Sequence, residues 1–172
     1  MNSLRLKKVL SLICMISILL LTFGCGESEQ EKREKAKLGA SIAPEIINLL
    51  SIPMVNAFAA PLYAIDPAKK ENVEEAKRTL ERFNEARELI KKNVPKKITL
   101  LKGWDDFYSE ALSLFSETED LMEDYYDLLL KSYKGKNILS DIKDYKDDVD
   151  KYSKKVEKVK ELYSPAWEAY AH

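Results

Sequence analysis

The fold class of this chain is decided by residues 138–163, which read ILSDIKDYKDDVDKYSKKVEKVKELY. Aliphatic and tyrosine side chains recur here in alternating steps of four and three residues, and charged residues fill most of the positions between them. This spacing places the apolar side chains on one narrow stripe of an α-helix, as in a coiled coil. We therefore predict a helix about 39 Å long, whose buried stripe contains Ile138, Ile142, Tyr145, Val149, Tyr152, Val156, Val159 and Tyr163.

A second long helix is predicted over residues 97–133. Its apolar positions also recur every three or four residues, but additional leucines make the apolar face wider than a seam between two helices. More than one neighbour must cover such a face, so we expect this helix to be the central one. Gly135 follows it, and glycine readily adopts the left-handed conformation that ends many helices. The helices of about 97–133 and 137–163 are therefore predicted to form an antiparallel hairpin.

The distribution of charge favours the same hairpin. Residues 104–130 contain nine acidic residues and no Lys or Arg, whereas residues 143–160 contain seven lysines. Exposed ion pairs contribute only about 0.2 to 1 kcal/mol each, so we expect these charges to select the antiparallel register more than to stabilise it. The predicted pairs are Glu110 with Lys160, Glu117 with Lys154, Glu119 with Lys151 and Asp127 with Lys143.

Two segments before the hairpin are predicted to complete the bundle. Asp66-Pro67 has the sequence of a helix start, and the helix that follows is expected to end before Pro95. The run Ile46–Ile65 has no charged residue but includes Pro53 and Pro61. We expect a buried helix with a kink at Pro53, and contact with a bilayer is the alternative, because the run also meets the length of a membrane span. The predicted fold class is all-α, an elongated three- to four-helix bundle.

The start of the chain has the pattern of an export signal. Three basic residues precede an uncharged apolar run, Val9–Phe23, which is short for a transmembrane helix. The run ends in Leu21-Thr22-Phe23-Gly24-Cys25, which resembles the lipobox of bacterial lipoprotein precursors. The resemblance covers the leader only, and it implies that Cys25 is diacylated and becomes the new N-terminus. Ordinary signal-peptidase cleavage and an uncleaved anchor are the alternatives, and both leave Cys25 as a free thiol.

The leader also suggests how the chain is divided. Residues 1–24 are expected to be a lipoprotein signal peptide, and residues 25–37 a lipidated cysteine followed by a charged segment that is either a frayed helix or a tether. Residues 38–172 are expected to form the helical-bundle domain. Because Cys14 lies in the leader, no intramolecular disulfide is expected, and the core must hold the domain together. The implied location is the extracytoplasmic side of a cell membrane or envelope.

Residue types that commonly carry chemistry are scarce in this sequence. His172 is the only histidine and is the last residue, so we expect neither histidine-based catalysis nor a multi-histidine metal site. The Glu-x-x-His motif of di-iron bundles does not occur, and the acidic residues around Asp124 are expected to form a solvated face. The 28 Lys and Arg residues do not outnumber the 29 Asp and Glu residues, which disfavours nucleic acid as a partner. The sequence thus predicts no enzyme, no cofactor and no metal.

Aromatic residues are expected to gather at the end of the hairpin away from Gly135. The fold-back brings Trp104 close to Tyr163, and Ser164-Pro165 either kinks the helix or starts a last short one that carries Trp167 and Tyr170. This cluster is a candidate surface for an envelope protein or a glycan, although aromatic residues at helical spacing usually pack in a core.

A lipid anchor without catalytic residues favours a non-enzymatic binding or structural module of the cell envelope. Two alternatives stay open. One is a protein that binds a small apolar, lipid-like ligand in a pocket lined by residues 46–65 and the 97–133 helix. The other is a protein that interacts with the bilayer through residues 46–65.

Overall fold

A computed structural model describes residues 29–93 and 104–171 of the chain, and the side chains of residues 29, 31, 32, 35, 36, 38–40, 93 and 164–171 lie outside this description. The described residues are mostly helical and contain no strand, which confirms the all-α fold class. The helices are α2 (Glu29–Leu50), α3 (Ile52–Ala59), α4 (Leu62–Ile65), α5 (Lys70–Asn93), α6 (Trp104–Ser113), α7 (Phe115–Tyr133) and α8 (Leu139–Ala171).

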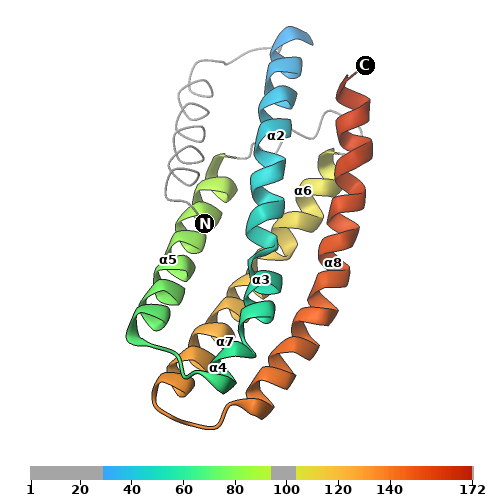
Figure 1. Cartoon of the computed structure of the whole chain (residues 1–172). Coiled ribbons are helices and arrows are strands. Elements are labelled where there is room, and N and C mark those ends of the chain that lie inside the picture. Colours follow the sequence, from blue (N-terminus) through green and yellow to red (C-terminus); the bar gives the residue numbers. More distant parts are fainter. Residues whose placement is uncertain (1–28, 94–103, 172) are drawn as a thin grey trace.

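These helices form the four columns of an elongated bundle (Figure 1). One column consists of α2, α3 and α4 in succession, a second consists of α6 and α7, and α5 and α8 are the other two. The α6–α7 column is central, as the width of its apolar face predicted: α7 packs against α3, α4, α5 and α8, and α6 packs against α2 and α8.

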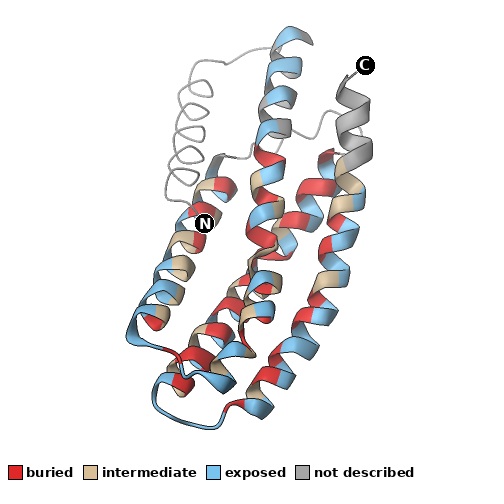
Figure 2. Cartoon of the chain, in the orientation of Figure 1, coloured by how far each residue is buried: buried red, intermediate tan, exposed pale blue. Residues whose placement is uncertain are grey.

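The core lies between the columns, where their buried residues face one another (Figure 2). The predicted stripe of the last helix is confirmed, because its first seven positions are buried and Tyr163 is half-buried. Phe83 of α5 and Phe115 of α7 meet edge to face with their ring centres 5.9 Å apart. Removal of such side chains from water, at about 25 cal/mol per Å², supplies most of the stability of the bundle.

The antiparallel hairpin is confirmed for α7 and α8, and its turn is built around Gly135. This glycine has a φ of +70°, in the left-handed region. Its N–H donates to the Ser132 carbonyl at 2.9 Å, and the N–H of Lys136 donates to the Lys131 carbonyl at 3.1 Å. These two bonds form a Schellman motif, which satisfies carbonyls that the end of α7 would otherwise leave without donors.

The lengths of α2 and α8 decide two alternatives that the sequence left open, the form of the charged segment and the course of the chain at Pro165. Residues 29–37 form the first turns of α2, so this part of the charged segment is helix. α8 continues through Pro165 to Ala171, so no separate helix starts there. The predicted helix of residues 97–133 is interrupted once, at Leu114. Residues 97–103, and likewise Pro95, lie outside the described part.

The predicted helix start at Asp66-Pro67 is wrong, because α5 begins at Lys70. The Asn72 side-chain oxygen accepts from the Lys69 N–H at 2.8 Å, so the first turn is capped from inside the helix. The Ala68 N–H donates to the Ser132 hydroxyl of α7 at 2.9 Å. This tertiary bond holds the chain in a non-helical path after Pro67.

The predicted charge register is only partly correct. Lys155, the neighbour of the predicted Lys154, pairs with Glu117 at 2.8 Å. Glu119 instead pairs with Arg87 of α5, because α7 lies between α5 and α8 and can turn this carboxylate toward only one of them. Lys160 pairs with Glu157 of its own helix at 2.7 Å. None of the four predicted pairs, including Asp127 with Lys143, is observed among the described residues, and the pair of Glu117 with Lys155 comes within one residue of the prediction.

Candidate functional site

The first column is broken near its middle by a proline. Pro53 has no N–H, so the Leu49 carbonyl four residues earlier has no helical donor at that position. α2 ends directly before Ser51, and α3 begins directly after it. The Ser51 hydroxyl donates to the Ile47 carbonyl at 2.7 Å. The kink predicted at Pro53 is therefore a one-residue break, with Pro53 in the first turn of the next helix, where a missing N–H costs little.

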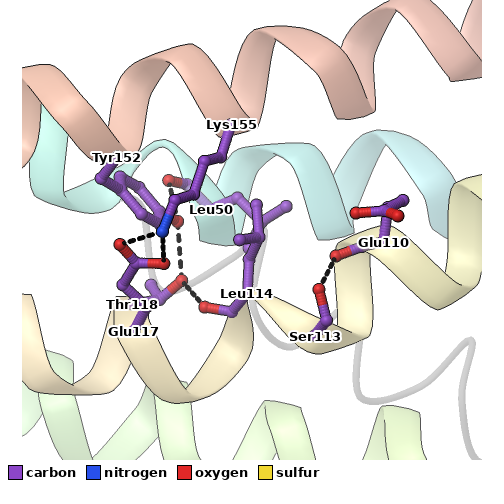
Figure 3. Close-up of polar contacts among 8 residues, drawn as sticks. All are labelled: Leu50, Glu110, Ser113, Leu114, Glu117, Thr118, Tyr152 and Lys155. Atoms are coloured by element: carbon purple, nitrogen blue, oxygen red, sulfur yellow. Dashed lines mark hydrogen bonds and ion pairs between the residues drawn. The ribbon is translucent and has the colours of Figure 1, made fainter.

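Two tyrosines of α8 hold this break in place. The Tyr152 hydroxyl donates to the Leu50 carbonyl at 2.8 Å (Figure 3), and the Tyr145 hydroxyl donates to the Pro53 carbonyl at 3.2 Å. The Tyr152 hydroxyl also lies 2.7 Å from the Thr118 hydroxyl of α7. One buried polar cluster thus joins the α2–α3 break to both helices of the hairpin.

This polar cluster has fewer protons than contacts. The Thr118 hydroxyl also lies within 2.7 Å of the Leu114 carbonyl, to which it donates. Thr118 and Tyr152 therefore bring two hydroxyl protons to three contacts, and one contact lacks a proton at any moment. Burial raises the pKa of both Tyr152 and Tyr145, so their hydroxyls stay protonated well into the alkaline range. The cluster acts as a structural tie between the columns.

A second tie fixes the lower end of the first column. The Ser132 hydroxyl donates to the Tyr63 carbonyl at 2.9 Å and accepts from the Ala68 N–H at the same distance. Ser132 is buried, so both bonds are shielded from water. α4 and the loop after it are therefore held against α7, and the opposite side of α4 faces solvent.

That solvent-facing side carries large apolar residues. Val55, Phe58, Leu62 and Ile65 are 66%, 86%, 62% and 85% exposed, respectively, and we call them the outer stripe. They follow one another in steps of three, four and three residues, so they lie along one side of α3 and α4. The opposite side of the column, which includes Pro53, Ala57 and Ala60, is buried in the core. The burial predicted for residues 46–65 is thus correct for one face only.

A cavity of about 340 Å³ opens at the same end of the bundle, between α4 and the turn that joins α7 to α8. Its volume is at the lower end of the range for small-ligand sites. The turn contributes four of its nine lining residues, and the segments predicted to line a ligand pocket contribute three. The predicted binding of an apolar ligand by residues 46–65 and the 97–133 helix stays a prediction; residues that line the observed cavity include Tyr63, Ala64, Ser132, Lys136, Asn137 and Leu139.

Two members of the predicted aromatic cluster are brought together. The rings of Trp104 and Tyr163 have their centres 6.2 Å apart, and Phe107 and Tyr108 pack against Trp104. Trp104 is fully buried, so its ring contributes to the core of the described structure. The side chains of Trp167 and Tyr170 lie outside the described residues, and a partner at this cluster stays a prediction.

The acidic face and the anchor complete the list of predicted sites. Burial, followed by the nearby Asp148 and Asp120 carboxylates, raises the pKa of Asp124. Within residues 29–93 and 104–171, no group of three or more His, Cys, Asp or Glu side chains is arranged to hold a metal ion. Cys25 lies outside the described residues.

Comparison of the chain with known protein families, with curated proteins and with solved structures gives no significant match. By length and composition, Ser41–Ile65 is the one segment of the described residues that is apolar enough to cross or associate with a membrane. Only 28% of its most apolar part is buried within the bundle, which agrees with the exposure of the outer stripe.

The outer stripe was not singled out by the sequence analysis, although its spacing is visible in the sequence. Residues 46–65 are apolar on nearly every side, so periodicity alone does not show which side faces the core. The tyrosine ties were missed for a different reason. The acceptors of Tyr145 and Tyr152 are backbone carbonyls about 90 to 100 residues away in the sequence, and no pattern of side chains marks them.

Proposed function

We propose that this protein is an extracytoplasmic bacterial lipoprotein, anchored through lipid on Cys25, whose helical bundle is a non-enzymatic binding or structural module of the cell envelope. The observation that carries the proposal is the leader, in which basic residues, an apolar run and Leu21-Thr22-Phe23-Gly24-Cys25 follow one another. A lipid anchor gives such a module its location and raises its effective concentration near envelope partners.

The position of α2 supports a short connection between anchor and bundle. α2 begins at Glu29, four residues after Cys25. Four residues span at most about 14 Å even when fully extended. The anchor would therefore keep the bundle close to the bilayer, where its long sides are available to other components of the envelope.

The residue types of the chain favour binding over catalysis. The single histidine, His172, leaves no partner for a histidine-based acid–base pair. The buried hydroxyls of Tyr145, Tyr152 and Ser132 are engaged with backbone carbonyls that hold the first column in place. Reproducible turnover of a substrate by the purified protein would contradict this part of the proposal.

The anchor is tested by fatty-acid labelling of cells that express the full chain. The wild-type protein should incorporate labelled fatty acid and fractionate with membranes, and Cys25→Ser should lose the label and accumulate as precursor. Cys14→Ser is a matched control, because it removes the other cysteine of the chain and should keep the label. Unlabelled wild-type protein in the cytosolic fraction would refute the proposal.

A further inference from the structure

We infer that the outer stripe docks onto the surface of the bilayer that holds the lipid anchor, with the bundle lying on its side. The inference rests on the proposed function, because the lipid on Cys25 is what brings the bundle to a bilayer. It adds an orientation and a second contact: Val55, Phe58, Leu62 and Ile65 enter the headgroup region, and the helices α7 and α8 lie on the other side of the column, with the turn that joins them beside α4.

The face around the outer stripe has the character of an interfacial helix. Single exposed apolar residues are common on soluble proteins, but four large ones along one line are unusual. From Ser41 to the stripe, the exposed residues of this column, Ser41, Pro44 and Asn48, are uncharged, whereas the exposed charges of α2, Arg33, Glu34 and Lys37, lie nearer its start. Glu45 is the only charged residue between Ser41 and Ile65, and it is half-buried. An uncharged face that becomes strongly apolar at one end suits shallow insertion between headgroups.

The area of the outer stripe favours a bilayer over a second copy of the chain or another folded protein. At their observed exposures, four large apolar side chains offer roughly 400 to 600 Å², taking about 150 to 200 Å² for each. A stable protein–protein interface buries about 800 Å² on each partner. A bilayer needs no complementary shape, so a few inserted side chains are enough to bind it when an anchor already holds the protein there.

The charges beside the stripe suit anionic headgroups. The loop between α4 and α5 and the turn between α7 and α8 meet at this end of the bundle, where both line the cavity next to α4. The loop of residues 66–69 and the turn of residues 134–138 contain three lysines and one aspartate, although the whole chain has a net charge of −1. All four are exposed: Asp66, Lys69, Lys134 and Lys136. Exposed lysines near a membrane surface attract anionic lipids.

The position of the anchor determines how the bundle must lie. The column begins with α2 at one end of the bundle and finishes with α4 at the other, and α3 and α4 carry the outer stripe (Figure 1). Val55 lies about 39 Å from Glu29 along this column, at roughly 1.5 Å per residue. Residues 25–29 span only about 14 Å, so an upright bundle could not bring both the anchor and the stripe to one bilayer. Both reach it only when the α2–α3–α4 column lies along the surface.

The inference is tested with a thiol-reactive, environment-sensitive dye on the mature lipoprotein. Lipidation blocks Cys25 and cleavage removes Cys14, so Ile65→Cys creates a single site for the dye in the stripe. Ser116→Cys is the matched control, since Ser116 is exposed on α7, whose other side packs against α3. Each labelled protein is reconstituted into vesicles of phosphatidylglycerol and phosphatidylcholine, and nitroxide-labelled lipid is the quencher.

We expect the dye at residue 65 to emit as in an apolar medium and to be quenched by the nitroxide lipid, and the dye at residue 116 to behave as in water. Adding Phe58→Asp should lower the equilibrium constant for the docked orientation at least about tenfold, because burial of one phenylalanine contributes more than the 1.4 kcal/mol that corresponds to this factor. Vesicles without phosphatidylglycerol, or high salt, should weaken docking.

Three results would overturn the inference. The first is a dye at residue 65 that stays in water on vesicles. The second is a dye at residue 65 that is shielded from water but is not quenched by the nitroxide lipid, or that becomes shielded in detergent as the protein concentration rises. Either result would mean that a second copy of the chain, and not the bilayer, covers the outer stripe. The third is reaction of the dye with the unsubstituted protein, which shows a free Cys25 and overturns the proposed function as well, so the two failures are distinguishable.

Discussion

The buried hydroxyl of Tyr152 is expected to stabilise the bundle by tying the broken column to the hairpin. Tyr152→Phe keeps the ring, which is fully buried, and removes only the hydroxyl that donates to the Leu50 carbonyl at 2.8 Å. A neutral hydrogen bond contributes about 0.5 to 1.5 kcal/mol, and a buried group that loses its partner costs about 1 to 3 kcal/mol. Because Leu50 is fully buried, water cannot replace the lost donor, and we expect a loss of about 1 to 3 kcal/mol.

The loss is measured by urea unfolding of the purified protein, followed by far-ultraviolet circular dichroism. Tyr133→Phe is the control, because this tyrosine is 49% exposed and its substitution should change the free energy of unfolding by less than about 0.5 kcal/mol. Thr118→Val tests whether the cluster is one unit. The double variant with Tyr152→Phe should show an interaction energy of at least about 0.5 kcal/mol, since the two hydroxyls are 2.7 Å apart.

A Tyr152→Phe protein with the unfolding midpoint of the wild type would refute this reasoning. It would mean that the Leu50 carbonyl finds another donor, and that the break at Ser51 is held by packing alone. Additive losses in the double variant would refute the narrower claim that Thr118 and Tyr152 act together.

Two further predictions concern the turn and the buried tyrosines. Gly135→Ala should lower the free energy of unfolding by about 1 kcal/mol, because its φ of +70° is unfavourable for alanine. An added Cβ meets no atom within 4 Å, so no steric clash adds to this cost. Gly135→Asn should cost less, because asparagine tolerates this conformation better, and equal urea midpoints for all three proteins would contradict the prediction. Burial raises the pKa of Tyr108, Tyr125, Tyr145 and Tyr152 above their usual value of about 10, so the folded state holds these protons more tightly than the unfolded state. This stability is fully present below about pH 10 and is lost as the pH rises above it. The tyrosinate absorbance of these four buried tyrosines should therefore appear together with loss of helical dichroism, and ionisation of all nine tyrosines in a protein that stays helical would contradict the prediction.

The hairpin could be predicted from sequence because its information is local. The stripe from Ile138 to Val159 repeats at helical spacing over seven positions, and Gly135 marks the turn. The start of α5 could not be predicted, because the Ala68 N–H is held by Ser132, 64 residues away. The partner of Glu119 was mispredicted for a related reason, since the sequence does not show the rotation of α7 that turns this carboxylate toward Arg87.

The candidate site was predicted in part. The uncharged segment was recognised as either buried or in contact with a bilayer, and the structure shows a buried face together with an exposed outer stripe. The pairing of Trp104 with Tyr163 followed from the fold-back of two helices of known length. The cavity beside Lys136 had no sequence signal, because its walls come from a turn and a short helix that meet only in the folded chain.

The sequence by itself determined the all-α class, the antiparallel hairpin and the stripe of the last helix, because helical periodicity and helix-ending glycine act within a few turns of the chain. Only the tertiary structure decided which face of residues 46–65 is buried, since nearly every side of that segment is apolar and the choice depends on where α7 and α8 pack. The bonds of Tyr152 to the Leu50 carbonyl and of Tyr145 to the Pro53 carbonyl, beside the break, likewise formed only when these side chains reached them from the far end of the chain. Contacts between residues about 90 to 100 positions apart follow from packing, and local sequence patterns do not encode them.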